Sequence, residues 1–156
     1  MITRSVLEAY RGQTIAQICP RGFASAHENH CAHFVSHVLG FQFGFTCAHM
    51  KPGPGSKASI RVHEVFHECR SVGKWEDKPV GLVQCLVFIT DAGNVHLAHR
   101  TMDNVPRKHV GILYDGLIWH YSNSQQKVVN QTPDLFKHHY PAPSNALFYG
   151  QIPWVP

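Results

Sequence analysis

The chain has 156 residues, of which 44% are hydrophobic and 15% charged, so it can form one domain with a substantial core and is too apolar for extended disorder. Its formal net charge of +4 comes from Lys and Arg residues dispersed along the chain, a pattern that argues against a nucleic-acid-binding stripe. No apolar run approaches the about 18 residues of a membrane-spanning helix. We expect a single domain over residues 1–156, with no membrane span and no nucleic acid as partner.

The first third of the chain predicts helices. Residues 28–39 carry apolar side chains at helical spacing, and Gly40 supplies a stop signal. Asn29 is the expected N-cap, which places Cys31 in the first turn. A second helix is expected over residues 58–71.

Strands predominate after the second helix. Residues 81–90 form a dense apolar run, 95–99 a short alternating one, and 146–152 the expected last strand. Before that strand, Thr132 and Pro133 predict a short helix, with Thr as its cap and Pro at its first position.

A hairpin is the strongest local signal in the sequence. Residues 109–114 and 117–122 flank Asp115-Gly116, a pair that favours a tight turn in which both central residues take positive φ. Helices followed by an antiparallel meander predict an α+β fold.

The hairpin register places two histidines together. With a two-residue turn, His109 and His120 lie on the same face as a diagonal pair, their Cβ atoms about 7 Å apart. Gly111 lies between them and leaves space for a hydrogen bond between the two rings. If the helix of Cys31 packs on that face, the three residues have the arrangement of a thiol nucleophile, a base and an orienting group. The helix N-terminus is expected to lower the pKa of the Cys31 thiol.

The cysteines indicate free thiols. The chain has five cysteines, an odd number, and no two of them form a C-x-x-C pair. This excludes a zinc ribbon and a thioredoxin motif. A scattered odd set fits a reducing compartment, with most thiols buried as small hydrophobes. The five are Cys19, Cys31, Cys47, Cys69 and Cys85.

Three segments resemble NlpC-type cell-wall cysteine peptidases. Cys31 heads C-A-H-F-V-S-H-V-L, which resembles the nucleophile helix of that family, and the L-V-F-I run at 86–89 resembles its apolar strand before the base. H-V-G-I-L-Y-D-G-L-I-W-H-Y-S-N resembles its two following strands, with His109 at the base and His120 at the third position. The order cysteine, histidine, histidine also agrees, and the resemblance covers residues 28–123.

The resemblance implies a papain-like fold, with the nucleophile-bearing helix packed on an antiparallel sheet. It also implies hydrolysis of an amide bond in peptidoglycan stem peptides by a Cys-His-His triad, with no cofactor and no metal. The sequence departs from the family at His30, where Asp is usual, and at Ala32 and His33, which replace Ser and Gly.

Two other families resemble the same residues. CHAP-type amidases share the helix-borne cysteine, and C-A-H-F-V also resembles lecithin–retinol acyltransferase-type proteins, in which the cysteine follows the histidines. A thiol acyltransferase and an inactive binding module on the same fold are therefore alternatives to the peptidase.

Stabilisation of an oxyanion would use the backbone N–H of Cys31, because it lies at a helix N-terminus. The second donor is open, with Asn29, Gln13 and Gln17 as candidates. Residues 1–5 show no apolar segment of a Sec signal peptide, so we expect a cytoplasmic protein or one delivered by another secretion route.

A competing motif spells H-E-x-x-H. His63, Glu64 and His67 have the spacing that places two imidazoles on one helix face, with the glutamate as base for a zinc-bound water. A third ligand would have to be a distant acid such as Glu76 or Asp91. A zinc-dependent hydrolase is thus the alternative enzyme class.

Overall fold

The computed structural model describes residues 2–40 and 61–153. Within them, a six-stranded antiparallel sheet runs in the order β1-β8-β2-β5-β6-β7, and a two-stranded sheet pairs β3 with β4. The strands are β1 (Val72–Lys74), β2 (Gln84–Asp91), β3 (Val95–His96), β4 (Thr101–Met102), β5 (His109–Tyr114), β6 (Leu117–Ser122), β7 (Lys127–Gln131) and β8 (Asn145–Gly150). The mixed α+β class with an antiparallel sheet is confirmed.

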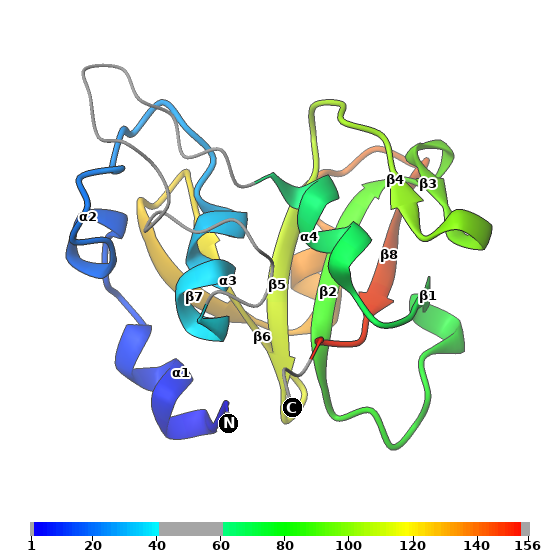
Figure 1. Ribbon diagram of the computed structural model, residues 1–156, viewed down its shortest axis with the longest axis horizontal. Helices are drawn as coiled ribbons and strands as arrows, with labels where there is room; N and C mark the ends of the chain where they lie inside the picture. Colours follow the sequence, from blue (N-terminus) through cyan, green and yellow to red (C-terminus); the bar gives the residue numbers. More distant parts are fainter. Residues whose placement is uncertain (1, 41–60, 154–156) are drawn as a thin grey trace.

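Helices cover both faces of the large sheet (Figure 1). They are α1 (Arg4–Tyr10), α2 (Ile15–Ile18), α3 (Cys31–Leu39), α4 (Val62–Glu68) and α5 (Pro133–Lys137). Short 3-10 turns, η2 (Trp75–Asp77), η3 (Ala92–Asn94) and η4 (Leu97–His99), connect the strands. The helices α1 to α4 pack on one face, and α5 packs on the other through Phe136. The sheet is thus the middle layer.

The side chains of β5 alternate between two apolar clusters. Val110 and Ile112 face the larger cluster, together with Phe34 and Val35 of α3. Leu113 faces the smaller cluster under α5. This alternation fixes which side chains of the strand can meet α3.

The hairpin prediction is confirmed. Tyr114 pairs with Leu117 across a two-residue turn, in which Asp115 has φ 50° and Gly116 has φ 79°. Both central residues therefore occupy the left-handed region that this turn requires.

Other boundaries differ by a few residues from those the sequence predicts. The predicted helix 28–39 begins at Cys31 with His30 as its N-cap, so the expectation that Asn29 caps it is wrong by one residue. Gly40 ends α3 with φ 58°. The described part of the helix predicted over 58–71 is α4. The strand predicted over 95–99 ends at His96, and η4 begins at the next residue, Leu97.

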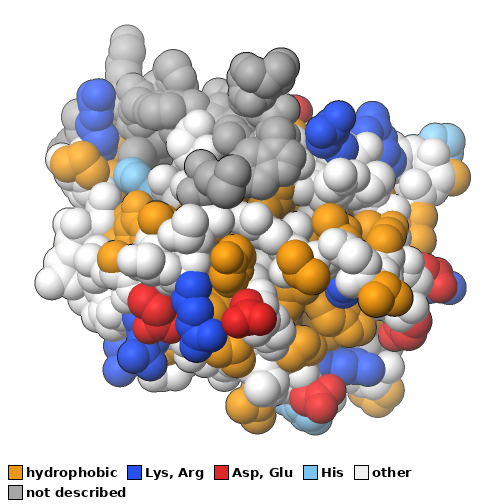
Figure 2. All heavy atoms as spheres, turned by 90° about the horizontal axis from the view of Figure 1, so that it is seen from below, with side chains coloured by type: hydrophobic (Ala, Val, Ile, Leu, Met, Phe, Trp, Pro, Cys, Tyr) orange, Lys and Arg blue, Asp and Glu red, His pale blue; other side chains and the backbone are white. Residues whose placement is uncertain are grey.

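The surface intersperses charges of both signs on the face that Figure 2 shows. Among the described residues, the large apolar side chains that stay exposed are Val6, Val80, Val83 and Leu135. None of the helices that the described residues form has the length and apolar character needed to cross a bilayer.

Candidate thiol active site

Cys31 is the first residue of α3 and lies at the junction of that helix with β5. Its side chain is 1% exposed, and its sulfur accepts a hydrogen bond from the backbone N–H of Val110. The backbone N–H of Cys31 donates to Oδ1 of Asn29 over 3.0 Å. The thiol is therefore held between the start of the helix and the start of the strand.

The prediction that the pKa of the Cys31 thiol is lowered is wrong. Burial raises the pKa of the thiol to about 12, against the opposing influence of the N–H groups of Val110, Ala32 and Cys31 and of the Lys108 cation. The helix N-terminus does stabilise the thiolate, as the sequence predicts, but desolvation is the larger effect. The resting thiol is consequently protonated at neutral pH.

Two imidazoles and one amide form a chain of hydrogen bonds beside this junction. Nε2 of His120 lies 2.8 Å from Oε1 of Gln131, an oxygen that can only accept, so His120 carries its proton on Nε2. Its Nδ1 then accepts from Nε2–H of His109, 2.8 Å away. His109 is left with a lone pair on Nδ1, which is buried and hydrogen-bonds to no described residue. Gln131 thus selects the tautomer of both rings.

Aromatic rings enclose the two imidazoles. Phe136 of α5 contacts both of them, and His139 stacks on His109 with ring centroids 4.0 Å apart. Burial lowers the pKa of His109 well below its ordinary value and that of His120 to about 4. Both rings are therefore neutral at neutral pH, which leaves Nδ1 of His109 as a basic lone pair.

The helix packs on the face opposite to the one expected. The thiol arrangement predicted from the sequence has α3 lie on the face of His109 and His120, but α3 packs on the face of Val110. The thiol nevertheless reaches the strand end, because it accepts from the N–H of Val110, the residue that directly follows His109. Cys31 thus lies beside the peptide bond that joins His109 to Val110.

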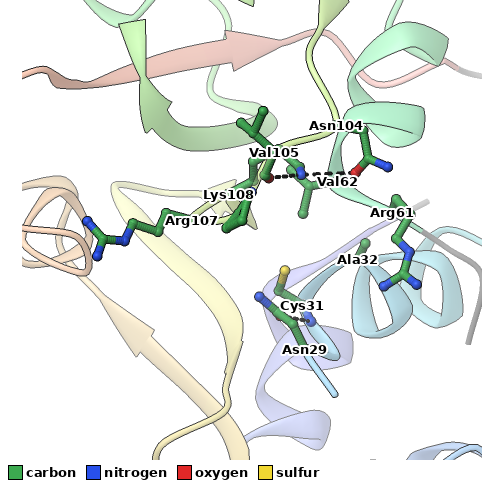
Figure 3. A pocket seen from close by; sticks show the side chains of 10 residues that line it. Asn29, Cys31, Ala32, Arg61, Val62, Asn104, Val105, Arg107 and Lys108 are labelled. Atoms are coloured by element: carbon green, nitrogen blue, oxygen red, sulfur yellow. Dashed lines mark hydrogen bonds between the residues drawn. The ribbon is translucent and has the colours of Figure 1, made fainter. Parts of the chain in front are cut away.

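A pocket of about 410 Å³ opens onto the thiol. Figure 3 shows the sulfur of Cys31 at its floor, with the loop that precedes β5 as the opposite wall. Three cationic side chains line it: Arg61, Arg107 and Lys108. Burial and the neighbouring Arg61 lower the pKa of Lys108. The pocket is suited to an anionic or carboxylate-bearing ligand.

Of the three oxyanion-donor candidates, Asn29 alone lines this pocket. Its Oδ1 is held by the N–H of Cys31, which leaves its side-chain NH₂ as a donor. Gln13 donates to the Ala9 carbonyl and Gln17 accepts from the N–H of Thr14, so both stabilise the first two helices and do not line the pocket.

The H-E-x-x-H residues lie on α4, and no residue that the structure describes joins them as a third ligand. Nε2 of His67 accepts from the backbone N–H of Met102, and Glu64 accepts from the backbone N–H of Arg61. Among the described residues, the metal-ligand group of three or more that forms is a different one, Cys19, His33 and His37. It includes neither Glu76 nor Asp91, the distant acids considered as third ligands.

Sequence reasoning missed Gln131 and His139. Gln131 pairs with Ile118, two residues before His120 on the same face, but the turn between β6 and β7 has no signature that fixes this register. His139 follows α5 and is brought to His109 by the packing of Phe136, which no local pattern reports.

Comparison of the chain with protein-family models, curated proteins and solved structures found no match.

Proposed function

We propose that the chain is a papain-like cysteine hydrolase that cleaves an amide bond, with Cys31 as nucleophile and His109 as general base. The observation that carries this proposal is the unpartnered, buried Nδ1 of His109, next to the peptide group that anchors the Cys31 thiol. A purely structural histidine pair gains nothing from a buried, unsatisfied nitrogen, which is costly to desolvate.

The resting pair is neutral, so proton transfer accompanies attack. As the Cys31 sulfur bonds to the carbonyl carbon, its proton moves to Nδ1 of His109. His120 accepts the Nε2–H of His109 and stabilises the imidazolium that forms, while Gln131 holds His120 in the accepting tautomer. His120 and Gln131 are positioning residues for the base.

The side-chain NH₂ of Asn29 is our choice for an oxyanion donor. Its amide is oriented by the bond from the Cys31 N–H to Oδ1, and it lines the same pocket as the thiol. When the tetrahedral intermediate collapses, His109 gives its proton to the leaving amine and a thioester remains on Cys31. Water then attacks the thioester with His109 again as base, which releases the acid and restores the thiol.

The substrate we propose is a peptidoglycan stem peptide. The resemblance of the sequence to NlpC-type peptidases favours this class, and the basic lining of the pocket supports it independently. Stem peptides carry free carboxylates, which Arg61 can bind beside the thiol.

The test is incubation of purified cell-wall fragments with the wild-type chain and with Cys31→Ala, followed by mass spectrometry of the fragments. We expect the wild type to release peptide fragments by cleavage of an amide bond and Cys31→Ala to release none. Cys85→Ala is the matched control, because it removes an equally buried thiol that does not line the pocket.

Trapping adds a second readout. A substrate ester should leave an acyl group on Cys31 of the wild type and none on His109→Ala, with circular dichroism showing that each variant is folded. Fragment release by Cys31→Ala equal to that of the wild type would overturn the proposal, and so would a folded wild type that neither cleaves fragments nor acylates.

A further inference from the structure

The side of α3 that faces α2 carries a second cluster of chemical groups. His33 and His37, one helical turn apart, lie beside Cys19, the residue that ends α2. One ligand atom from each of the three lies within 4.8 Å of the other two. Cys19 and His33 are buried, and His37 is half-buried.

We propose that Cys19, His33 and His37 bind one Zn²⁺ ion, with a water molecule as the fourth ligand. One thiolate and two imidazoles are ligands that zinc prefers, and three protein ligands plus water is a known zinc coordination. The Nε2 atoms of His33 and His37 are 3.2 Å apart. Two nitrogens at about 2.0–2.1 Å from a tetrahedral zinc ion are themselves roughly 3.3 Å apart, so the pair is already at its liganded separation.

A second hydrogen-bond chain orients the His33 ring for this role. Nε2 of His30 lies 2.7 Å from the Ser25 carbonyl, which can only accept, so His30 carries its proton on Nε2. Nδ1 of His30 then accepts from Nδ1–H of His33, 3.2 Å away. The lone pair of His33 is therefore on Nε2, directed at the cluster. A ligating imidazole commonly has such a partner on its other nitrogen.

The protonation states agree with this geometry. Burial, followed by the charges of His37 and His30, lowers the pKa of His33 to about 3, and burial also lowers the pKa of His37. Both rings are neutral at neutral pH, the form that binds metal. Binding requires the Cys19 thiol to release its proton to solvent and the His37 ring to present a lone pair on Nε2.

The ion would join α2 to the nucleophile helix. The α2 helix is already attached to the sheet, because the Ile15 N–H donates to the Tyr121 hydroxyl over 3.1 Å. A zinc ion bound through Cys19, at the other end of α2, would attach α3 to α2. The ion would hold α2 and α3 together, and it would not touch the Cys31 pocket, which none of the three ligands lines.

The test uses the full chain freed of metal with a chelator and kept reduced, titrated with Zn²⁺ against a chromophoric competitor. We expect one equivalent to bind. Cys19→Ser and His37→Gln should each bind at least tenfold more weakly, and His30→Asn about 10- to 100-fold more weakly, because it loses the partner of His33. His67→Gln is the matched control and should bind as the wild type does, since His67 lies outside the cluster.

Co²⁺ in place of Zn²⁺ reports directly on the thiolate ligand, with circular dichroism to show that each variant is folded. The wild type should show a thiolate-to-cobalt charge-transfer band, which Cys19→Ser lacks. The proposal is overturned if the wild-type chain binds no Zn²⁺ or shows no such band. It is equally overturned if His67→Gln abolishes binding while a folded Cys19→Ser retains it.

Discussion

Nε2 of His109 and Nδ1 of His120 lie 2.8 Å apart, with their ring planes at 86° to one another. His120 is a neutral imidazole, which can accept this hydrogen bond only if its own proton is on the other nitrogen. Gln131 enforces that choice from the neighbouring strand. A carboxylate in the place of His120 would need no such help, because it accepts in every orientation.

Replacement of Gln131 by Leu should therefore impair catalysis more than binding. Without the acceptor, His120 can present N–H instead of its lone pair to His109, so we expect kcat to fall roughly 10- to 100-fold with KM nearly unchanged. Steady-state kinetics on a stem-peptide substrate measure the split. Gln131→Glu keeps the acceptor and should retain more activity, with the acid limb of its pH profile shifted upward. A rise in KM at constant kcat would contradict a positioning role.

Gly111→Ala should disturb the space between the imidazoles. A Cβ atom at this position would lie 2.5 Å from Cγ2 of Ile118 and 3.1 Å from Cβ of His120. We expect a loss of about 1–3 kcal/mol in the free energy of unfolding, measured by urea titration, together with lower kcat. Gly81→Ala is the control, because a Cβ atom there meets nothing within 4 Å. Equal stability of the two variants would refute the close approach at Gly111.

The buried histidines should make the fold sensitive to acid. The folded-state pKa of His120, about 4, lies below its ordinary value of 6.5, so between these pH values the unfolded chain binds a proton that the folded chain does not. The stability that depends on a neutral His120 ring is complete above about pH 6.5. It is lost as pH falls toward 4, by about 3 kcal/mol in total. The depressed pKa of His109 acts in the same direction.

Urea unfolding as a function of pH checks this dependence. His120→Asn should flatten the loss of stability between neutral pH and pH 4, whereas His27→Asn, an exposed residue, should leave the slope unchanged. A slope that His120→Asn does not alter would show that other groups cause the acid sensitivity.

The cations of the pocket should select substrates by charge. We expect Arg61→Gln to raise KM about two- to fivefold for a stem peptide with free carboxylates, because it removes an exposed ion pair. The same variant should leave KM unchanged for the amidated peptide. Added salt should weaken binding of the acidic peptide by the wild type, and Arg21→Gln, which lies outside the pocket, serves as the control. Equal effects on both peptides would exclude a charge contact.

Local chemistry explains which parts of the fold the sequence could predict. The Asp115-Gly116 pair predicts the type of turn directly, because few other residue pairs suit a turn with two positive φ angles. The turn in turn fixes the register of β5 and β6. Gly40 likewise determines the end of α3. These features depend on residues that are adjacent in the chain.

The features that the sequence did not predict depend on contacts between distant segments of the chain. The first turn of α3 is visible in the sequence, but the depth at which Cys31 is buried is not, so the direction of its pKa shift could not be predicted. The same holds for Gln131, which reaches His120 only because β7 pairs with β6 in one particular register. The face on which α3 packs was likewise undetermined by the pattern of β5.

The two-residue turn at Asp115 and Gly116 sets whether His120 lies on the same face as His109. Side chains alternate along a strand, so one residue inserted into this turn would rotate His120 to the face that α3 covers and would separate it from His109 and Gln131. Two inserted residues would preserve the faces but lengthen the path between the rings. The eleven-residue interval between the two histidines is therefore a constraint on the length of a surface turn, a position where most hairpins tolerate change.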